Sequence, residues 1–298
     1  MPAHATDRLE LVRYDVFTDT PYAGNPLAVA IDPPELTAAQ MQRVAAELNL
    51  SETVFLRPRP DGTWTARIFT PVTELPFAGH PTVGAALALV DEGLVGDGTV
   101  VLHEGVGAVP VEVADGVATL TTPGPPQPVD VADPGEVVEV LGLTFADLHP
   151  ELGPRGWTVG VPFTMVGVRD LDVLARAAVD AARWQVEVAH SGAPDLYVLA
   201  PLDGVRGERW RAWMFGPAVG MVEDPATGSA AAAAAAYLAA HAGDSRLDAG
   251  WTIHQGVEMG RPSEIRIQPV RRSGELVAVR VGGCAVRVGS GELVLPPA

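Results

Sequence analysis

The sequence predicts an α+β fold with two similar domains, each a curled β-sheet around one central apolar helix. Two observations support this prediction: strand-like segments outnumber helical ones, and one strand-loop-helix pattern occurs twice, about half the chain apart. The loop Glu74–His80 precedes the apolar run Pro81–Val90, and Glu223–Ser229 precedes Ala230–Ala240. A helix without a polar face must be covered on all sides, which in a strand-rich domain requires a sheet wrapped around it. We therefore expect two domains that face each other, with the active site between the two loops.

The elements of the first half follow from periodicity and turn residues. Thr37 with Gln40 three residues later forms a capping box, so a helix should begin there and pack Met41 and Val44 on a sheet. Asp115-Gly116 is typical of a tight hairpin turn. The sequence predicts strands at 9–17, 27–31, 51–56, 65–69, 109–113 and 117–121, and a second helix at 81–92.

A proline-rich segment, Thr122–Pro128, is the best candidate for a linker because proline cannot join a helix interior or a central strand. It divides the chain into domains 1–124 and 125–298. Beyond it the sequence predicts helices at 135–141, 171–184 and 230–240. Strands are expected at 163–168, 196–200, 210–215, 264–268, 276–281, 285–288 and 292–295.

Composition excludes several classes of function. The chain has 298 residues and a net charge of −17, with 37 acidic against 20 basic residues, which disfavours binding to nucleic acid. No signal-like N-terminal pattern or membrane-length apolar run occurs, so we expect a cytoplasmic protein without a membrane partner. The single cysteine, Cys284, excludes disulfides within the chain. Histidine spacing typical of metal sites and nucleotide-binding fingerprints are missing, so no metal and no cofactor are expected.

The two repeated loops have the features of an anion site. Gly79-His80 and Gly228-Ser229 each stand at the expected start of a helix, where unpaired N–H groups and a partial positive charge favour a carboxylate or phosphate. Simple helix capping is the alternative, since Ser229 suits an N-cap in any protein. Two matching loops, both with polar groups beside the glycine, favour the anion site.

Five segments together resemble the PhzF family of phenazine-biosynthesis isomerases. They are Gly24-Asn25-Pro26, Met41–Glu52, Arg67–Gly84, Glu223–Ala230 and Gln255–Ser263. They extend over nearly the full chain in the family's order. The resemblance implies the diaminopimelate-epimerase-like fold, which agrees with the duplicated sheet-around-helix prediction. It also implies a homodimer and a final strand that crosses back to the first domain.

The resemblance further assigns an active site. It implies Glu52 as the catalytic acid and base, with His80 and Asp224 beside it, and Ser229, Gly79 and Gly228 holding a substrate carboxylate. Related epimerases use two cysteines, whereas the matching loops here contain Ala78 and Asp224, so thiol chemistry is excluded. A carboxyl group buried in a cleft would have a raised pKa, suited to accepting a proton and returning it.

The implied reaction is the cofactor-free isomerisation of trans-2,3-dihydro-3-hydroxyanthranilate, in which hydrogen moves from C3 to C1 of the ring. Two alternatives stay open. The chain could carry out a related isomerisation or epimerisation of another small amino or hydroxy acid. It could also be a non-catalytic protein that binds a small carboxylate, although binding alone would not need Glu52, His80 and Asp224 together.

Overall fold

The computed structural model describes residues 8–204, 207–219, 221–240 and 250–297. These residues form two compact units. The first unit contains the described residues up to Leu120 together with those from Gly282 onward, and the second runs from Thr121 to Val281. The proline-rich segment predicts a division between residues 124 and 125.

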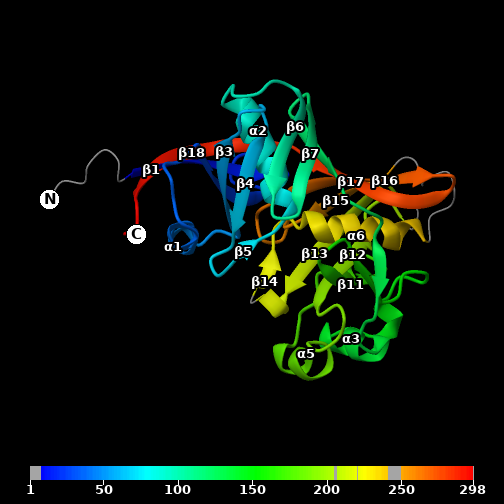
Figure 1. The fold of residues 1–298 in the computed structure, drawn as a ribbon. Helices are drawn as coiled ribbons and strands as arrows, with labels where there is room; N and C mark the ends of the chain where they lie inside the picture. The colour runs from blue at the N-terminus through cyan, green and yellow to red at the C-terminus, as the bar shows by residue number, and fades with distance from the viewer. Residues whose placement is uncertain (1–7, 205–206, 220, 241–249, 298) are drawn as a thin grey trace. The chain divides into compact units, whose positions relative to one another are not determined.

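The first unit is built around helix α2 (Gly79–Asp91), whose residues from His80 to Leu89 are all buried. The helix packs against β1, β2, β3, β6, β7 and β18, which confirms that a helix without a polar face is enclosed by strands (Figure 1). The strands are β1 (Arg8–Val16), β2 (Asn25–Ile31), β3 (Glu52–Pro58), β4 (Trp64–Phe69), β5 (Glu74–Leu75), β6 (Gly98–Glu104), β7 (Gly107–Ala114), β8 (Val117–Thr121) and β18 (Ala285–Val294).

Helix α1 (Ala38–Leu48) lies against β3 and β4 and packs on a separate part of the core. The predicted capping box is present, with the Thr37 hydroxyl accepting from the Gln40 N–H and the Gln40 side chain accepting from the Thr37 N–H. Met41 and Val44 are buried on its inner face, in a cluster with Phe55. Asn49 ends the helix in a left-handed conformation (φ 50°), so the chain turns into β3 three residues later.

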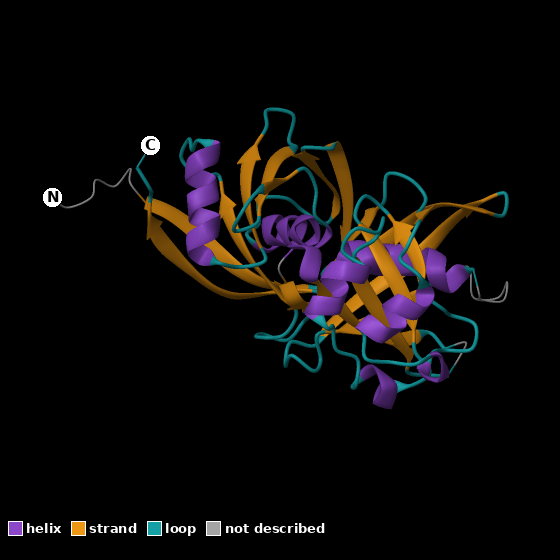
Figure 2. Ribbon diagram, turned by 90° about the horizontal axis from the view of Figure 1, so that it is seen from below, coloured by secondary structure: helices purple, strands orange, loops and turns teal. Residues whose placement is uncertain are grey.

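The second unit repeats the plan around α6 (Gly228–Ala239), which packs on β10, β11 and β16 and is buried from Ala230 to Leu238. Outer helices cover the other side of β11 and β12 with a core of valine and leucine (Figure 2). These are α3 (Pro134–Val140), α4 (Leu171–Leu174) and α5 (Ala181–Glu187), with 3₁₀ turns at Phe145–Asp147 and Pro217–Val219. The strands are β9 (Gln127–Val129), β10 (Arg155–Thr158), β11 (Pro162–Gly167), β12 (Asp195–Pro201), β13 (Arg209–Gly216), β14 (Met221–Asp224), β15 (Trp251–Gln255), β16 (Ser263–Arg272) and β17 (Glu275–Gly283).

Strand pairing is the same in the two units, which confirms the predicted duplication. In the first, β2 pairs in parallel with β3 (Leu27 opposite Glu52), and β3 pairs antiparallel with β4 (Thr53 opposite Phe69). In the second, β11 pairs in parallel with β12 (Phe163 opposite Asp195), and β12 pairs antiparallel with β13 (Leu196 opposite Phe215). In each unit a fourth strand pairs in parallel with the third. This strand is β6 beside β4 in the first unit and β15 beside β13 in the second.

Three predicted elements differ from the structure. The single helix expected at 171–184 is wrong: it is two short helices, because Asp180 caps a new helix through the N–H groups of Ala182 and Arg183. Part of the predicted linker is a strand, since β9 pairs with β10. The two last strands are one, β18, which pairs with β1 from Arg8 opposite Val294 to Val16 opposite Ala285. Among the described residues, no helix has the length and apolar character needed to cross a membrane.

Candidate active site

Glu52 and His80 meet in the first unit. Glu52 is the first residue of β3, opposite Leu27 of β2, and His80 is the second residue of α2. The Glu52 Oε2 atom lies 3.4 Å from His80 Nδ1, and their side chains are 17% and 6% exposed. A carboxyl group and an imidazole are therefore held side by side with little access to water.

Burial determines the charge of His80. It lowers the pKa of His80 to about 3, although a hydrogen bond with the Pro26 backbone acts in the opposite direction. The imidazole is thus neutral at physiological pH, with one nitrogen that donates and one that accepts. The contact between the two side chains is therefore not an ion pair with a charged imidazole.

The segment Gly24-Asn25-Pro26 approaches the same pair, since Pro26 contacts His80 and Leu27 lies opposite Glu52. Gly24 has a φ of +64°, and a Cβ atom there would lie 2.4 Å from the carbonyl oxygen of Val16. Only glycine fits this position. Three of the segments identified in the sequence therefore converge at one place within the first unit.

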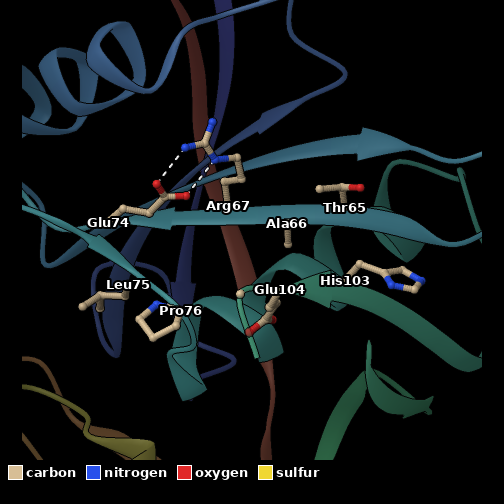
Figure 3. Close-up of a pocket in the computed structure, with 9 residues that line it drawn as sticks. Thr65, Ala66, Arg67, Glu74, Leu75, Pro76, His103 and Glu104 are labelled. Atoms are coloured by element: carbon tan, nitrogen blue, oxygen red, sulfur yellow. Dashed lines mark hydrogen bonds and ion pairs between the residues drawn. The ribbon is translucent and has the colours of Figure 1, made fainter. Parts of the chain in front are cut away.

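The loop before α2 is held by hydrogen bonds at two points. The Arg67 guanidinium of β4 donates two hydrogen bonds of 2.7 Å to the carboxylate of Glu74, which begins the loop (Figure 3). On the other side the Val106 N–H donates to the Pro76 carbonyl at 3.1 Å. Ala78 is the N-cap of α2 and provides no side-chain cap, so the first N–H groups of the helix have no acceptor within the helix itself.

Asp224 lies in the matching loop of the second unit and belongs to a buried polar network. Its carboxylate accepts a short hydrogen bond from the Thr227 hydroxyl, and its backbone carbonyl accepts from Gln255 Nε2 at 2.7 Å. Gln255 Oε1 in turn accepts from the Tyr197 hydroxyl at 3.0 Å and from the Thr227 N–H at 3.2 Å. Burial, reinforced by the charge of Asp224, raises the pKa of Tyr197 well above its usual value, so the phenol stays a donor.

Gly228 and Ser229 begin α6, with Gly228 buried and Ser229 half-buried. The N-cap Thr227 does not use its side chain to cap the helix, because its hydroxyl is committed to Asp224. The first N–H groups of α6 therefore receive no hydrogen bond from the Thr227 side chain. Of the six predicted residues, Glu52, His80 and Gly79 lie together in the first unit, and Asp224, Gly228 and Ser229 in the second.

Sequence reasoning missed three buried polar residues. Gln255 organises the Asp224 loop, and it begins a segment already noted for the family resemblance. Asp195 occupies the position in β12 that Glu52 has in β3, a match visible only from the strand register. Burial raises the pKa of Asp195 to about 6, while the Ala218 N–H donates to it at 3.1 Å. Glu104 of β6 is 8% exposed and bonds to Thr82 of α2.

Comparison with known proteins identifies the family of this chain. The family model described as phenazine biosynthesis-like protein (PhzC-PhzF) matches residues 14–291. The chain belongs to this family. A PhzF relative named trans-2,3-dihydro-3-hydroxyanthranilate isomerase, from Pseudomonas chlororaphis, is 37% identical over 94% of this chain and 98% of its own length. The protein of the same name from Pseudomonas aeruginosa is 38% identical over the same shares. An uncharacterized isomerase from Mesorhizobium japonicum is 39% identical over 95% of this chain and 97% of its own.

Solved structures show the same PhzF fold. A PhzF-family protein from Bacillus anthracis has a TM-score of 0.85 and covers 97% of this chain and 99% of its own, at 24% identity. A predicted epimerase from Pseudomonas aeruginosa has a TM-score of 0.79 at 33% identity and covers 97% of this chain and 100% of its own. The fold and the family resemblance expected from the sequence are thus confirmed, and the curated relatives are named isomerases.

Proposed function

We propose that this chain isomerises trans-2,3-dihydro-3-hydroxyanthranilate, with Glu52 as the group that moves the proton. The observation that carries the proposal is the Glu52 carboxyl 3.4 Å from a buried, neutral His80, in a chain 37–38% identical to enzymes named for this reaction. A carboxyl group held in this way can accept a proton from one carbon and return it to another.

In the proposed reaction the Glu52 carboxylate removes the hydrogen on C3 of the ring as a proton. The electron pair of the broken C–H bond shifts into the ring, and the carboxylic acid then delivers the proton to C1. The resulting enol tautomerises to a ketone. The neutral imidazole of His80 donates its one N–H to the Pro26 carbonyl, so in this proposal its other nitrogen accepts a hydrogen bond from the substrate and helps to orient the ring beside Glu52.

The second-unit groups serve to bind the substrate in this proposal. Asp224, already held by Thr227 and Gln255, accepts from the substrate amine or hydroxyl. The N–H groups at the starts of α2 and α6, at Gly79 and Gly228, and the Ser229 hydroxyl are proposed to hold the carboxylate. Fixing the ring in this way would present C3 and C1 to one carboxyl group.

The decisive experiment replaces Glu52 by glutamine. The Glu52→Gln protein should bind 3-hydroxyanthranilate, an aromatic amino carboxylate of the same shape, but lose at least about 100-fold in kcat with dihydrohydroxyanthranilate. Glu47→Gln, which removes an exposed carboxylate from α1, is the matched control and should keep the wild-type rate. A Glu52→Gln enzyme within tenfold of wild type would refute Glu52 as the proton carrier.

A different small carboxylate is the second candidate substrate, because the relative that is 39% identical is named only an uncharacterized isomerase. Wild-type protein that leaves dihydrohydroxyanthranilate unchanged, while binding it, would favour this alternative over the phenazine reaction. Cyclic amino and hydroxy acids incubated in deuterated water would then reveal the substrate, since an epimerised or isomerised carbon takes up deuterium. Binding without exchange for any of them would leave only the non-catalytic carboxylate-binding function.

The setting of the enzyme is also a proposal. We infer a cytoplasmic homodimer that needs neither cofactor nor metal and has no nucleic-acid or membrane partner. The support is the net charge of −17 and the family resemblance. Light scattering coupled to size exclusion should give twice the mass of 31.1 kDa, and dialysis against a chelator should leave the rate unchanged.

A further inference from the structure

Glu104, the last residue of β6, lies beneath the loop that carries His80. Its Oε1 atom is 2.7 Å from the Thr82 hydroxyl, and the same hydroxyl is 2.7 Å from the carbonyl oxygen of Ala78. Ala78 is the N-cap of α2, two residues before His80. Glu104 also lines a cavity of about 480 Å³ beside Pro76, below the Arg67–Glu74 ion pair (Figure 3).

The two contacts of the Thr82 hydroxyl determine the protonation state of Glu104. A hydroxyl has one proton to donate, whereas a carbonyl and an ionised carboxylate can only accept. The two contacts of the Thr82 hydroxyl can therefore both be hydrogen bonds only when Glu104 is protonated. Glu104 then donates to the Thr82 hydroxyl, and this hydroxyl donates to the Ala78 carbonyl. The second oxygen of Glu104 supports the same conclusion. It is fully buried and meets no hydrogen-bond donor among the described residues, an environment that strongly disfavours a charged oxygen.

We propose that protonated Glu104 is a positioning residue, which acts through Thr82 on the Ala78 carbonyl and so fixes the turn that sets His80 against Glu52. This rests on the proposed function, in which His80 and Glu52 act on the substrate. The segment after Glu104 is hydrogen-bonded to the same turn, because the Val106 N–H donates to the Pro76 carbonyl. A Cβ atom on Gly105 would lie 2.7 Å from the Pro76 Cα, so the two chain segments are in close contact.

Ionisation of Glu104 should loosen this arrangement. Burial raises the pKa of Glu104 to about 7, although the Thr82 hydrogen bond acts in the opposite direction. Once ionised, the carboxylate accepts the hydrogen bond from the Thr82 hydroxyl, and the Ala78 carbonyl keeps only the hydrogen bond from the Thr82 N–H at 3.2 Å. The titratable groups on the surrounding elements are Arg67 of β4, Glu74 of β5, His103 of β6 and His80 of α2. Arg67 and Glu74 neutralise each other, and His80 stays neutral above pH 3.

The pH dependence of kcat tests the proposal. Wild-type kcat should fall several-fold as the pH rises from 6 to 8.5. Glu104→Gln should lose this alkaline decrease, because the amide donates to Thr82 at every pH, and its kcat at pH 6 should stay within about threefold of wild type. Glu104→Leu should lower kcat at least fivefold across the range with little change in KM. Asp97→Asn removes an exposed carboxylate just before the same strand and should follow the wild type.

Identical pH profiles for wild type and Glu104→Gln would overturn the proposal. Failure of the proposed function would be recognised separately, because the wild-type protein would then not turn over the substrate. In that case the turn can still be followed by NMR through the imidazole carbon signal of His80, which is assigned with the His80→Gln variant. That signal should shift with a midpoint near pH 7 in wild type and stay constant in Glu104→Gln. A signal that is flat in both proteins would also refute the role of Glu104.

Discussion

Gly84 lies where the enclosing strands approach α2 most closely, and a substitution there measures how tightly they pack. A Cβ atom at this position would lie 2.5 Å from Leu27 Cδ2 and 2.7 Å from Val16 Cγ2, about 1 Å inside normal carbon–carbon contact. Gly84→Ala should gain about 1 kcal/mol from helix propensity and lose about 1–3 kcal/mol from overpacking. Leu27 can move the end of its side chain, whereas the branched Val16 is stiff. We therefore expect a net loss of about 1 kcal/mol.

Urea unfolding of Gly84→Ala and wild type measures this difference directly. Ala46→Gly, at an exposed position of α1, calibrates the propensity term and should cost about 1 kcal/mol. Because α2 carries His80 at its second position, a displaced helix should also reduce kcat. A Gly84→Ala protein more stable than wild type by the full amount that Ala46→Gly loses would contradict the reasoning, since helix propensity alone would then account for it.

Two further substitutions probe buried polar groups. Burial raises the pKa of Asp195 from 3.8 to about 6, so the folded protein holds a proton that the unfolded chain has released within this window. The free energy of unfolding of wild type relative to Asp195→Asn should therefore fall as the pH rises from about 4 to 6, by up to about 1.4 kcal/mol per pH unit. Urea unfolding of both proteins at each pH measures this difference, and a difference that does not change with pH would contradict the prediction. Tyr237→Phe removes hydrogen bonds to the Leu152 carbonyl (2.6 Å) and from the Gly167 N–H (2.8 Å) and should cost about 1–3 kcal/mol. Tyr22→Phe, at a 75% exposed position, is its control in the same unfolding assay and should change little.

Local sequence signals were enough for the elements that determine the fold. The apolar runs after Gly79 and Gly228 predicted both enclosed helices, and the Thr37–Gln40 capping box placed the start of α1. The hairpin at Asp115-Gly116 was also correct, since both residues have the positive φ values, 52° and 74°, that such a turn needs. In each case the deciding interactions lie within a few residues of one another.

Signals from distant residues were harder to detect. The break between α4 and α5 was missed because the apolar pattern continues across it, while the cap that restarts the helix is a single aspartate, Asp180. The closeness of Glu52 and His80 was inferred from the family resemblance, not from spacing. Glu104 and Asp195 gave no sequence signal, since their meaning depends on a strand register and on a hydroxyl from another element.

The pairing of β1 with β18 has a consequence for biosynthesis. The two strands are joined across positions 284 residues apart in the chain, at Arg8 and Glu292. On the ribosome, β1 emerges long before its neighbour exists, so one of its edges stays open throughout the synthesis of everything between them. The second unit runs to Val281 and β18 begins at Ala285, so both units receive their last strand only near the end of synthesis. During most of its translation the chain therefore carries an unpaired strand edge that can pair with other chains. A chaperone that covers this edge would act mainly in that period.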